Sequence, residues 1–275
     1  MSDKMKIFCV TDVESKILEE LNLILVGVGK RKFSKNYINI KNRDNIQNKE
    51  KNYSELTFQY WFWKNLLDTG NPNWIGFCQK RRFWLKKNSN LELKKTFNFI
   101  NDHLNKPDPE WDTFDAIICN SINVNKVKKI KLLKRGFRSI IKNPSIFFNE
   151  EKQNLALHFD MHHGYGNLDK AISVMDEKDR LDFKNYVNTS FTYNPHIMFI
   201  AKSNIHKKWF DTLFPWLERC EKIFKTDTLK GYDTQRLYAY LAERYLPFWF
   251  NKYTHVKEWP WIFFDTQTKL NLDGK

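Results

Sequence analysis

The sequence predicts an α/β fold in which helices flank a largely parallel sheet, and three observations lead to this. Short apolar runs alternate along the chain with segments of helical spacing, as in strand–helix–strand units. Hydrophobic residues make up 41% of the 275 residues, enough for a sizeable core. No repeat, linker or low-complexity block divides the chain. We therefore expect one domain over residues 1–275, with an α/β core over about 5–205 and C-terminal helices over about 206–253.

The expected strands are short apolar runs that end in polar residues or glycine. They cover residues 6–11, 23–28, 74–78, 115–119 and 196–201. Helical spacing of apolar residues predicts helices over 53–67, 168–175, 180–186, about 207–224 and about 234–250. Ser54 is the expected N-cap of the first of these helices. The preceding segment, residues 35–51, is polar and rich in Asn, which predicts a loop.

The chain is strongly basic, with 46 Lys and Arg against 32 Asp and Glu and a net charge of +14. Such a surplus favours an anionic partner: nucleic acid, an anionic membrane surface or a phosphorylated substrate. Lys and Asn abound throughout, and the charge is spread along the chain. Its densest run is interrupted by apolar residues, which predicts an amphipathic basic helix or loop that rests on a membrane or forms a plain solvated face. The run contains Lys126, Lys128, Lys129, Lys131, Lys134, Arg135 and Arg138.

Cysteine usage and hydropathy indicate a protein of the cytoplasm. The four cysteines lie far apart and form no Cys-x-x-Cys pair, so we expect buried reduced thiols and no metal or redox motif of that type. The first residues lack the apolar stretch of a signal peptide, and no apolar run approaches the roughly 20 residues that span a bilayer. We predict a cytoplasmic protein, either soluble or peripheral at the inner face of the membrane.

The sequence lacks the glycine-containing motifs of several enzyme classes. The chain has only 9 Gly, and neither Gly-x-Gly-x-x-Gly nor a P-loop motif occurs. A Gly-x-Ser-x-Gly elbow is also missing. These absences argue against Rossmann dehydrogenases, P-loop enzymes and α/β hydrolases.

The segment His158-Phe-Asp-Met-His162-His163 concentrates groups that bind metals or move protons. On an extended strand, His158, Asp160 and His162 would share one face and could bind a divalent metal. Asp160 or His163 could instead serve as a general base in a pocket. The alternative is that these polar side chains hydrogen-bond backbone groups at the junction of a strand and a loop.

Two charged segments follow predicted strands. Asp12-Val-Glu14 approximates the Asp-x-Asp pattern that holds a divalent ion on a diphosphate, although acids at a helix N-terminus would look the same. Lys80-Arg81-Arg82 follows the strand at 74–78, and arginine matches the geometry of phosphate oxygens. A solvated triplet is the alternative, but apolar neighbours on both sides weigh against it.

Six motifs occur in a recognisable order along the chain. The first three are Asp44-Asn-Ile, Tyr53-x-Glu55-Leu-Thr57-x-x-Tyr60-Trp61-x-Trp63-Lys64-Asn65 and Trp74-Ile-Gly76-Phe-Cys78-Gln-x-Arg81-Arg82-Phe83. The others are Asn194-Pro-His196-Ile-Met198-Phe-Ile200, Leu213-Phe-Pro-Trp216-Leu-Glu218 and Leu241-Ala-Glu243-Arg244. Together they resemble a bacterial family of capsular and exopolysaccharide biosynthesis glycosyltransferases, over roughly residues 5–250. Gln79 and Lys80 depart from the His and Tyr that the family commonly has there.

The resemblance implies a GT-A-like fold with a mixed, mostly parallel sheet and a helical C-terminal part. It also implies transfer of a sugar from a nucleotide donor, with UDP favoured, to a growing capsular, exopolysaccharide or lipooligosaccharide glycan. Some relatives transfer galactofuranose. The implied partners are the nucleotide sugar and a free or lipid-linked glycan acceptor, with a peripheral contact to anionic membrane and no nucleic acid. The cofactor stays open between none and a divalent Mn²⁺ or Mg²⁺.

This interpretation gives each motif residue an expected role. Sugar transfer needs cations at the leaving diphosphate and a base beside the acceptor hydroxyl. Asp160 or His163 is the expected base. The expected donor-binding residues are Asp44, Asn45, Glu55, Tyr60, Trp63, Lys64, Asn65, Arg81 and Arg82. Expected at the acceptor, or supporting the site, are Asn194, His196, Met198, Glu243 and Arg244.

Two other functions compete with this one. A non-enzymatic nucleic-acid-binding protein would use the charge of +14 and the many aromatic rings, although no recognised binding motif is present. A metal-dependent hydrolase would use His158, Asp160 and His162.

Overall fold

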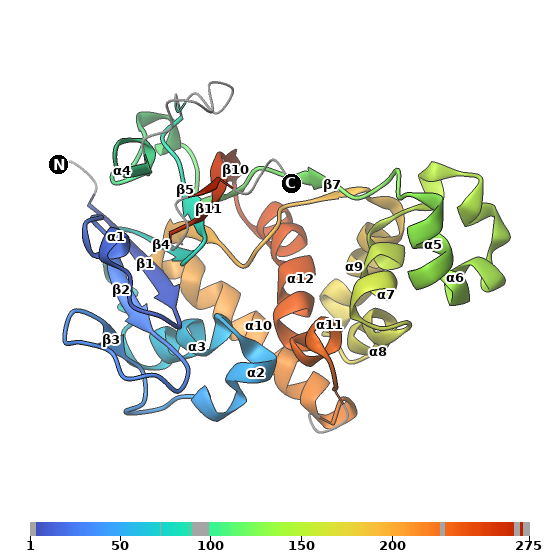
Figure 1. Ribbon diagram of the computed structural model, residues 1–275, viewed down its shortest axis with the longest axis horizontal. Coiled ribbons are helices and arrows are strands. Elements are labelled where there is room, and N and C mark those ends of the chain that lie inside the picture. The colour runs from blue at the N-terminus through green and yellow to red at the C-terminus, as the bar shows by residue number, and fades with distance from the viewer. Residues whose placement is uncertain are drawn as a thin grey trace.

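A mixed β-sheet flanked by helices forms the centre of the protein in its computed structural model (Figure 1). The structure describes residues 4–71, 73–87, 89, 99–225, 229–266 and 270–271. The strands lie across the sheet in the order β10 (Val256–Trp259), β6 (Ala116–Cys119), β9 (Phe199–Lys202), β4 (Trp74–Gln79), β1 (Met5–Thr11), β2 (Ile24–Gly27) and β3 (Ile38–Asn39). This confirms the predicted α/β fold with its mostly parallel sheet.

One antiparallel strand joins two parallel parts of the sheet. Strands β4, β1, β2 and β3 are parallel to one another, and β6 is parallel to β10. Strand β9 lies between β4 and β6 and is antiparallel to both. The beginning of β9 therefore lies at the edge of the sheet where β1 and β4 end.

Further strands extend from the end of β4. The short strand β5 (Arg82–Trp84) folds back on β4 and pairs with β11 (Trp261–Asp265), which pairs with β12 (Leu270–Asn271). A separate ribbon consists of β7 (Ile122–Asn123) and β8 (Thr192–Tyr193).

Both faces of the sheet are buried, as the apolar runs predict. In β1, Phe8 and Val10 pack into one core while Ile7 and Cys9 pack into a second. Gly76 in β4 lets β9 come close, because a Cβ atom there would lie 2.7 Å from the Cγ1 atom of Ile200. All four cysteines are buried free thiols, as predicted.

The helices divide between the sheet and a separate group. Figure 1 shows α5 to α9 gathered at the end of the molecule opposite β1–β3. The other helices are α1 (Lys16–Glu19), α2 (Glu50–Tyr53), α3 (Leu56–Asn65), α4 (Phe99–Asp102), α10 (Ser203–Ile223), α11 (Tyr232–Gln235) and α12 (Leu237–Tyr253), of which α11 contacts α7. The separate group comprises α5 (Lys129–Arg135), α6 (Phe137–Lys142), α7 (Leu155–His163), α8 (Asn167–Ser173) and α9 (Glu177–Thr189).

The predicted elements are present with three corrections. The helix expected over 53–67 is α3 and begins only at Leu56, because Ser54 has a φ of 52° and ends the separate helix α2, whose first residues lie in the segment expected as a loop. The strand expected from His196 begins only at Phe199, because His196 has a φ of 67° that no strand allows.

The third correction concerns the histidine-rich segment, which was expected as a strand and forms helix α7. The Asn154 side chain caps this helix by accepting a hydrogen bond from the Leu157 N–H (3.0 Å), and Gly164 ends it with a φ of 100°. In a helix His158 and His162 lie one turn apart, and their rings stack at 4.4 Å. Asp160 therefore points to a different side of the helix from the two histidines.

Among the described residues, no helix is long and apolar enough to cross a membrane.

Candidate functional site

A cavity of about 360 Å³ opens at the carboxyl ends of β1, β2 and β4. Ligands of open α/β sheets bind at this edge, because the loops that follow parallel strands meet there. The segment that leads into the antiparallel β9 adds His196 and Ile197 to the same edge, and α2 and α12 form the opposite wall. Eight charged side chains line the cavity: Asp12, Glu50, Glu55, Lys80, Arg81, Arg82, Arg236 and Glu243.

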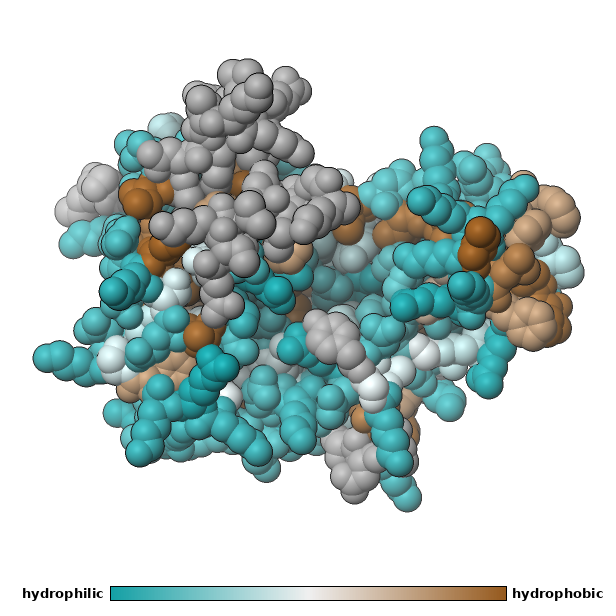
Figure 2. All heavy atoms as spheres, viewed as in Figure 1, coloured by the Kyte–Doolittle hydropathy of each residue, from teal (hydrophilic) through white to brown (hydrophobic). Residues whose placement is uncertain are grey.

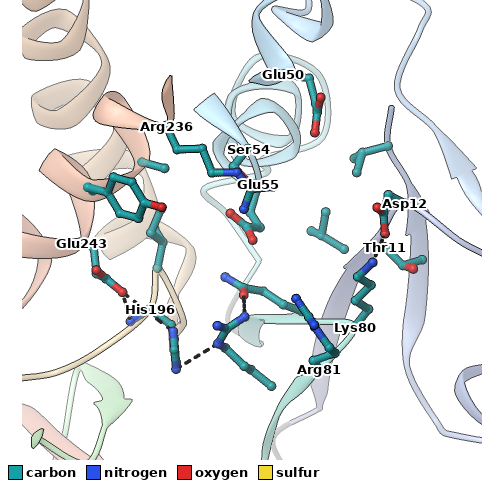
Figure 3. A pocket seen from close by; sticks show the side chains of 17 residues that line it. Thr11, Asp12, Glu50, Ser54, Glu55, Lys80, Arg81, His196, Arg236 and Glu243 are labelled. Atoms are coloured by element: carbon teal, nitrogen blue, oxygen red, sulfur yellow. Dashed lines mark hydrogen bonds and ion pairs between the residues drawn. The ribbon is translucent and has the colours of Figure 1, made fainter. Parts of the chain in front are cut away.

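The sheet side of the cavity is cationic. The two-residue turn between β4 and β5 holds Lys80 and Arg81, so the end of a buried strand presents both side chains to the cavity. Lys80 is ion-paired with Asp12, which follows β1. Figure 3 shows Lys80 and Arg81 entering from the sheet side and Glu55 and Arg236 from the helical side.

Arg81 has an unsatisfied donor inside the protein. Its Nε atom is buried and has no hydrogen-bond partner among the described residues. Its guanidinium lies 5.7 Å from the centre of the Phe263 ring. Leaving a buried donor unpaired costs about 1–3 kcal/mol, and more for a charged group. The Arg81 side chain also lines the cavity, so it brings a positive charge that favours an anionic ligand there.

Arg82 is held by side chains of the cavity wall. It donates to Oε1 of Gln79 (3.1 Å) and to Nε2 of His196 (3.1 Å). Burial, and then the charge of Arg82, hold the pKa of His196 well below its ordinary value. His196 is therefore neutral at pH 7, and because Nε2 accepts a hydrogen bond, its ring proton lies on Nδ1.

Glu243 of α12 is fixed from two sides. Its Oε1 accepts from the backbone N–H of His196 (2.6 Å), and its Oε2 pairs with Nη1 of the buried Arg244 (3.0 Å). Arg244 also donates to Nδ1 of His158 (2.9 Å) and lies 3.7 Å from the centre of the Tyr193 ring. This network holds the carboxylate at the cavity wall.

Two strained backbone positions lie at the cavity. Four non-glycine residues have a positive φ in the described chain, and two of them, Ser54 and His196, line the cavity. Such conformations cost about 1–3 kcal/mol each and cluster at functional sites. The strained Ser54 directly precedes Glu55, the N-cap residue of α3, which also lines the cavity.

The cavity brings together five of the residues that the sequence singled out. They are Glu55, Arg81, Arg82, His196 and Glu243. Lys80 and Asp12, weighed above as phosphate and metal ligands, also line it. The remaining expected site residues lie elsewhere.

Most of the segment from Asp44 to Asn65 holds a loop in place. Asn65 donates to the Asp44 backbone carbonyl (2.7 Å), and Tyr60 donates to the Asp44 carboxylate (3.3 Å). Asn45 donates to the backbone carbonyl of Arg43 (2.8 Å). These bonds fasten the loop before α2 to the outer side of α3, away from the cavity lining.

Trp63 joins α3 to α10, and Lys64 lies over the Trp63 ring. The Trp63 ring stacks on Phe214 at 5.3 Å, and its Nε1 donates to Asp211 (3.1 Å). Nζ of Lys64 lies 3.5 Å above the Trp63 ring. Neither residue lines the cavity.

Asn194 and Met198 are buried in the structure around β9. Asn194 donates to the Cys119 backbone carbonyl (2.7 Å) and to Glu258 (2.8 Å). Met198 belongs to the second core. Both support the sheet beside the cavity and do not line it.

The expected bases, Asp160 and His163, also lie outside the cavity lining. Asp160 accepts from the Gly166 N–H (2.9 Å), and burial raises its pKa to about 6. His163 stacks on the cavity residue Tyr240 at 3.7 Å, and burial, then Arg244, lower its pKa to about 3.

The histidine-rich segment does not form the metal site that a hydrolase would need. His158 accepts from Arg244, and burial followed by the Arg244 charge lowers its pKa to about 2. Among the described residues, no group of three or more His, Cys, Asp and Glu could hold a metal ion. The expected alignment of His158, Asp160 and His162 on one strand face was wrong, because the segment is helical.

Sequence reasoning missed Glu50 and Arg236. Glu50 begins α2 within a segment interpreted as a loop, and Arg236 directly precedes α12. In a chain with 46 Lys and Arg, neither residue stands out by type. Only the packing of α2 and α12 beside the sheet edge brings them to the cavity.

Comparison with known proteins yields a family and a fold. A family model described as "Domain of unknown function (DUF4422)" matches residues 6–255. A solved structure described as the apo form of a bifunctional glycosyltransferase, WbbM, is similar with a TM-score of 0.67 and 19% sequence identity. The similarity covers 95% of this chain and 45% of that chain, so this chain spans less than half of that protein. A comparison with curated proteins gives no match.

Proposed function

The chain belongs to the DUF4422 family, and on that premise we propose that it is a glycosyltransferase whose cavity binds a nucleotide-sugar donor. The observation that carries the proposal is the group of cations formed by Lys80, Arg81 and Arg82 in a cavity at the carboxyl edge of the sheet. A glycosyltransferase-like fold supports it. We propose UDP as the nucleotide and a capsular, exopolysaccharide or lipooligosaccharide glycan as the acceptor, with galactofuranose among the candidate sugars.

The cations of the cavity would stabilise the leaving diphosphate. As the bond between sugar and phosphate breaks, negative charge grows on the phosphate oxygens, and fixed cations lower the barrier. We assign this role to Arg81 and Lys80. Arg82 is held by Gln79 and His196, so it adds positive charge from a fixed position.

The carboxylates of the cavity would act on the sugars. Glu243 is held by the His196 N–H and by Arg244, so it is suited to stabilising the positive charge that develops on the donor sugar. Glu55 is the carboxylate that we assign as the base for the acceptor hydroxyl. We prefer it to Asp160 and His163 because it lines the cavity.

The described residues do not fit a divalent cation held by a carboxylate cluster. The carboxylate after β1, Asp12, is ion-paired with Lys80, and no described cluster offers three ligands. We therefore assign the stabilisation of charge on the leaving diphosphate to Lys80 and Arg81, which line the cavity.

A thermal-shift screen of nucleotide sugars, with and without Mn²⁺, tests the function. A ligand at one hundred times its Kd stabilises a protein by about 2.7 kcal/mol. For a chain of this length that is a rise in Tm of roughly 5–10 °C. We expect such a rise with a UDP-sugar, and failure of every nucleotide sugar to raise Tm would refute the donor site.

Substitution of Arg81 tests the role of the cavity. Loss of a hydrogen bond from a charged group costs about 1.5–3 kcal/mol, so Arg81→Gln should weaken donor binding roughly 10- to 150-fold in calorimetry. The matched control is Arg138→Gln, at an exposed arginine of α6. Equal Kd values for Arg81→Gln and the wild type would show that the donor binds elsewhere.

A further inference from the structure

The outer side of α5, α6 and the following 3₁₀ turn η3 (Pro144–Phe147) exposes large apolar side chains. Twelve large hydrophobic residues are exposed in the described chain, and five of them lie here within 19 consecutive positions. Ile130 is 69% exposed and Phe148, directly after η3, is 82% exposed. We call this surface the α5–α6 face; its apolar members are Ile130, Leu133, Phe137, Ile141 and Phe148.

The same segment holds more than half of the net charge of the protein. Residues 126–149 contain eight Lys and Arg and no Asp or Glu. The rest of the chain then has 38 basic and 32 acidic residues, an excess of only six. Basic residues occur throughout the chain, but their excess over acidic residues is largest at one end of the molecule, where Figure 2 shows brown apolar atoms bordered by teal polar ones.

The exposed side chains are not a loosely packed core. The inner side of the segment packs in its own small cluster on α7, made of Leu132, Ile146, Leu157 and Met161. The segment is thus apolar on two sides, and only one side is used within the chain. Solvated helices normally carry polar residues on the second side.

From these observations we propose that the α5–α6 face docks the protein on an anionic membrane surface. Lysine and arginine attract anionic lipid headgroups, while Ile, Leu and Phe side chains enter the boundary between headgroups and acyl chains. Nucleic acid would complement the positive charge of the α5–α6 face. It offers no apolar layer in which the exposed Ile, Leu and Phe side chains of the two helices could be buried. A membrane matches both properties.

Docking would also orient the cavity. Arg135 of α5 is ion-paired with Asp233 of α11 (3.4 Å), and Arg236 of the cavity follows that helix. His163 of α7, the helix on which the segment packs, stacks on the cavity residue Tyr240. The docked face and the cavity wall are therefore joined through α7 and α11. If the proposed function holds, this would keep the cavity near a lipid-linked acceptor.

Vesicle flotation without any nucleotide tests the docking by itself. Wild-type protein is mixed with vesicles of phosphatidylcholine alone, or of phosphatidylcholine with phosphatidylglycerol, at low and high salt. We expect binding to the anionic vesicles only, weakened by salt because surface charges are screened. Vesicle binding is measured independently of sugar transfer. The protein could therefore fail to bind vesicles and still be a glycosyltransferase, or bind vesicles without being one.

Two sets of variants test the two properties of the face. Lys128→Gln with Lys131→Gln and Lys134→Gln should weaken binding on the order of a hundredfold, at about fivefold per basic residue. Phe137→Ser with Phe148→Ser should weaken it at least about tenfold. The controls are Lys170→Gln with Lys184→Gln and Lys208→Gln, and Leu181→Ser, which alters a residue of α9 that is 76% exposed. Circular dichroism and Tm check that all variants fold.

The proposal is overturned if the wild type does not float with anionic vesicles, or if both face variants bind as the wild type does. It is also overturned if the face variants only dissociate an oligomer in analytical ultracentrifugation while vesicle binding is unchanged. The face would then be an interface between copies of the chain.

Discussion

His158 has to lose its hydrogen bond from Arg244 before it can take up a proton. Its Nδ1 accepts from Nη2 of that buried cation at 2.9 Å, so the ring is neutral in the folded protein. Burial first, and then the Arg244 charge, lower the pKa of His158 from 6.5 to about 2. A base with a lowered pKa stabilises the fold above its unfolded pKa, and this contribution is lost as the pH falls below 6.5.

The size of this effect follows from the two pKa values. Between pH 7 and pH 5 the unfolded chain gains most of one proton at this position and the folded chain gains none. The free energy of unfolding therefore falls by about 2 kcal/mol on account of His158 alone, at about 1.4 kcal/mol per pH unit. The variant His158→Gln should lose this dependence while the rest of the protein keeps its own.

Urea unfolding followed by tryptophan fluorescence at pH 7, 6 and 5 measures the dependence. The quantity compared between the variant and the wild type is the change in the free energy of unfolding with pH. The absolute free energy is not compared, because the glutamine side chain of the variant would also change the hydrogen bond to Arg244. The control is His255→Gln, which alters an exposed histidine. If His158→Gln and the wild type lose the same free energy between pH 7 and pH 5, His158 is not held neutral as argued.

Two further substitutions test packing and burial. Asp160→Asn should raise the free energy of unfolding by about 1–2 kcal/mol at pH 8 and leave it unchanged below pH 4. The reason is that burial raises the pKa of Asp160 to about 6, so the ionised carboxylate is disfavoured in the folded protein. Urea unfolding at both pH values measures this effect, and an equal gain in stability at both would contradict it. Gly76→Ala should cost about 1–3 kcal/mol, because the added Cβ would lie 2.7 Å from Ile200. A loss of less than about 0.5 kcal/mol in thermal unfolding would show that β4 and β9 separate easily.

The strands and the long helices could be predicted from local patterns of apolar residues in the sequence. The run at 6–11 is β1, and helical periodicity located α10 and α12, because burial against a sheet imposes the same spacing on most sequences. The prediction of a strand from His158 to His163 was wrong, because polar and apolar residues alternate there over only a few positions and the same pattern also fits a helix. The capping residue Asn154 was the local signal for the helix.

The cavity could be predicted in part, from charged residues that follow a strand and from Glu55, His196 and Glu243 of the family motifs. Arg81 and Arg82 were identified because they come after β4, and the edge of the sheet fixed where they would lie. Trp63 and Asn65 belong to the motif that carried the family resemblance, yet their contacts fasten helices and a loop. Motif membership alone does not distinguish a residue that binds a ligand from one that positions the wall around it.

The antiparallel strand β9 has a consequence for the order in which the protein assembles. The strands β1 and β4 can pair within the first 79 residues, but β9 joins them only after residue 199. Contacts between such distant segments form slowly, because a long loop must close first. We therefore expect β1 and β4, which carry the cationic turn at Lys80 and Arg81, to pair before His196 and Glu243 reach the cavity. During synthesis the sheet side of the cavity would then form before α12 adds the opposite wall.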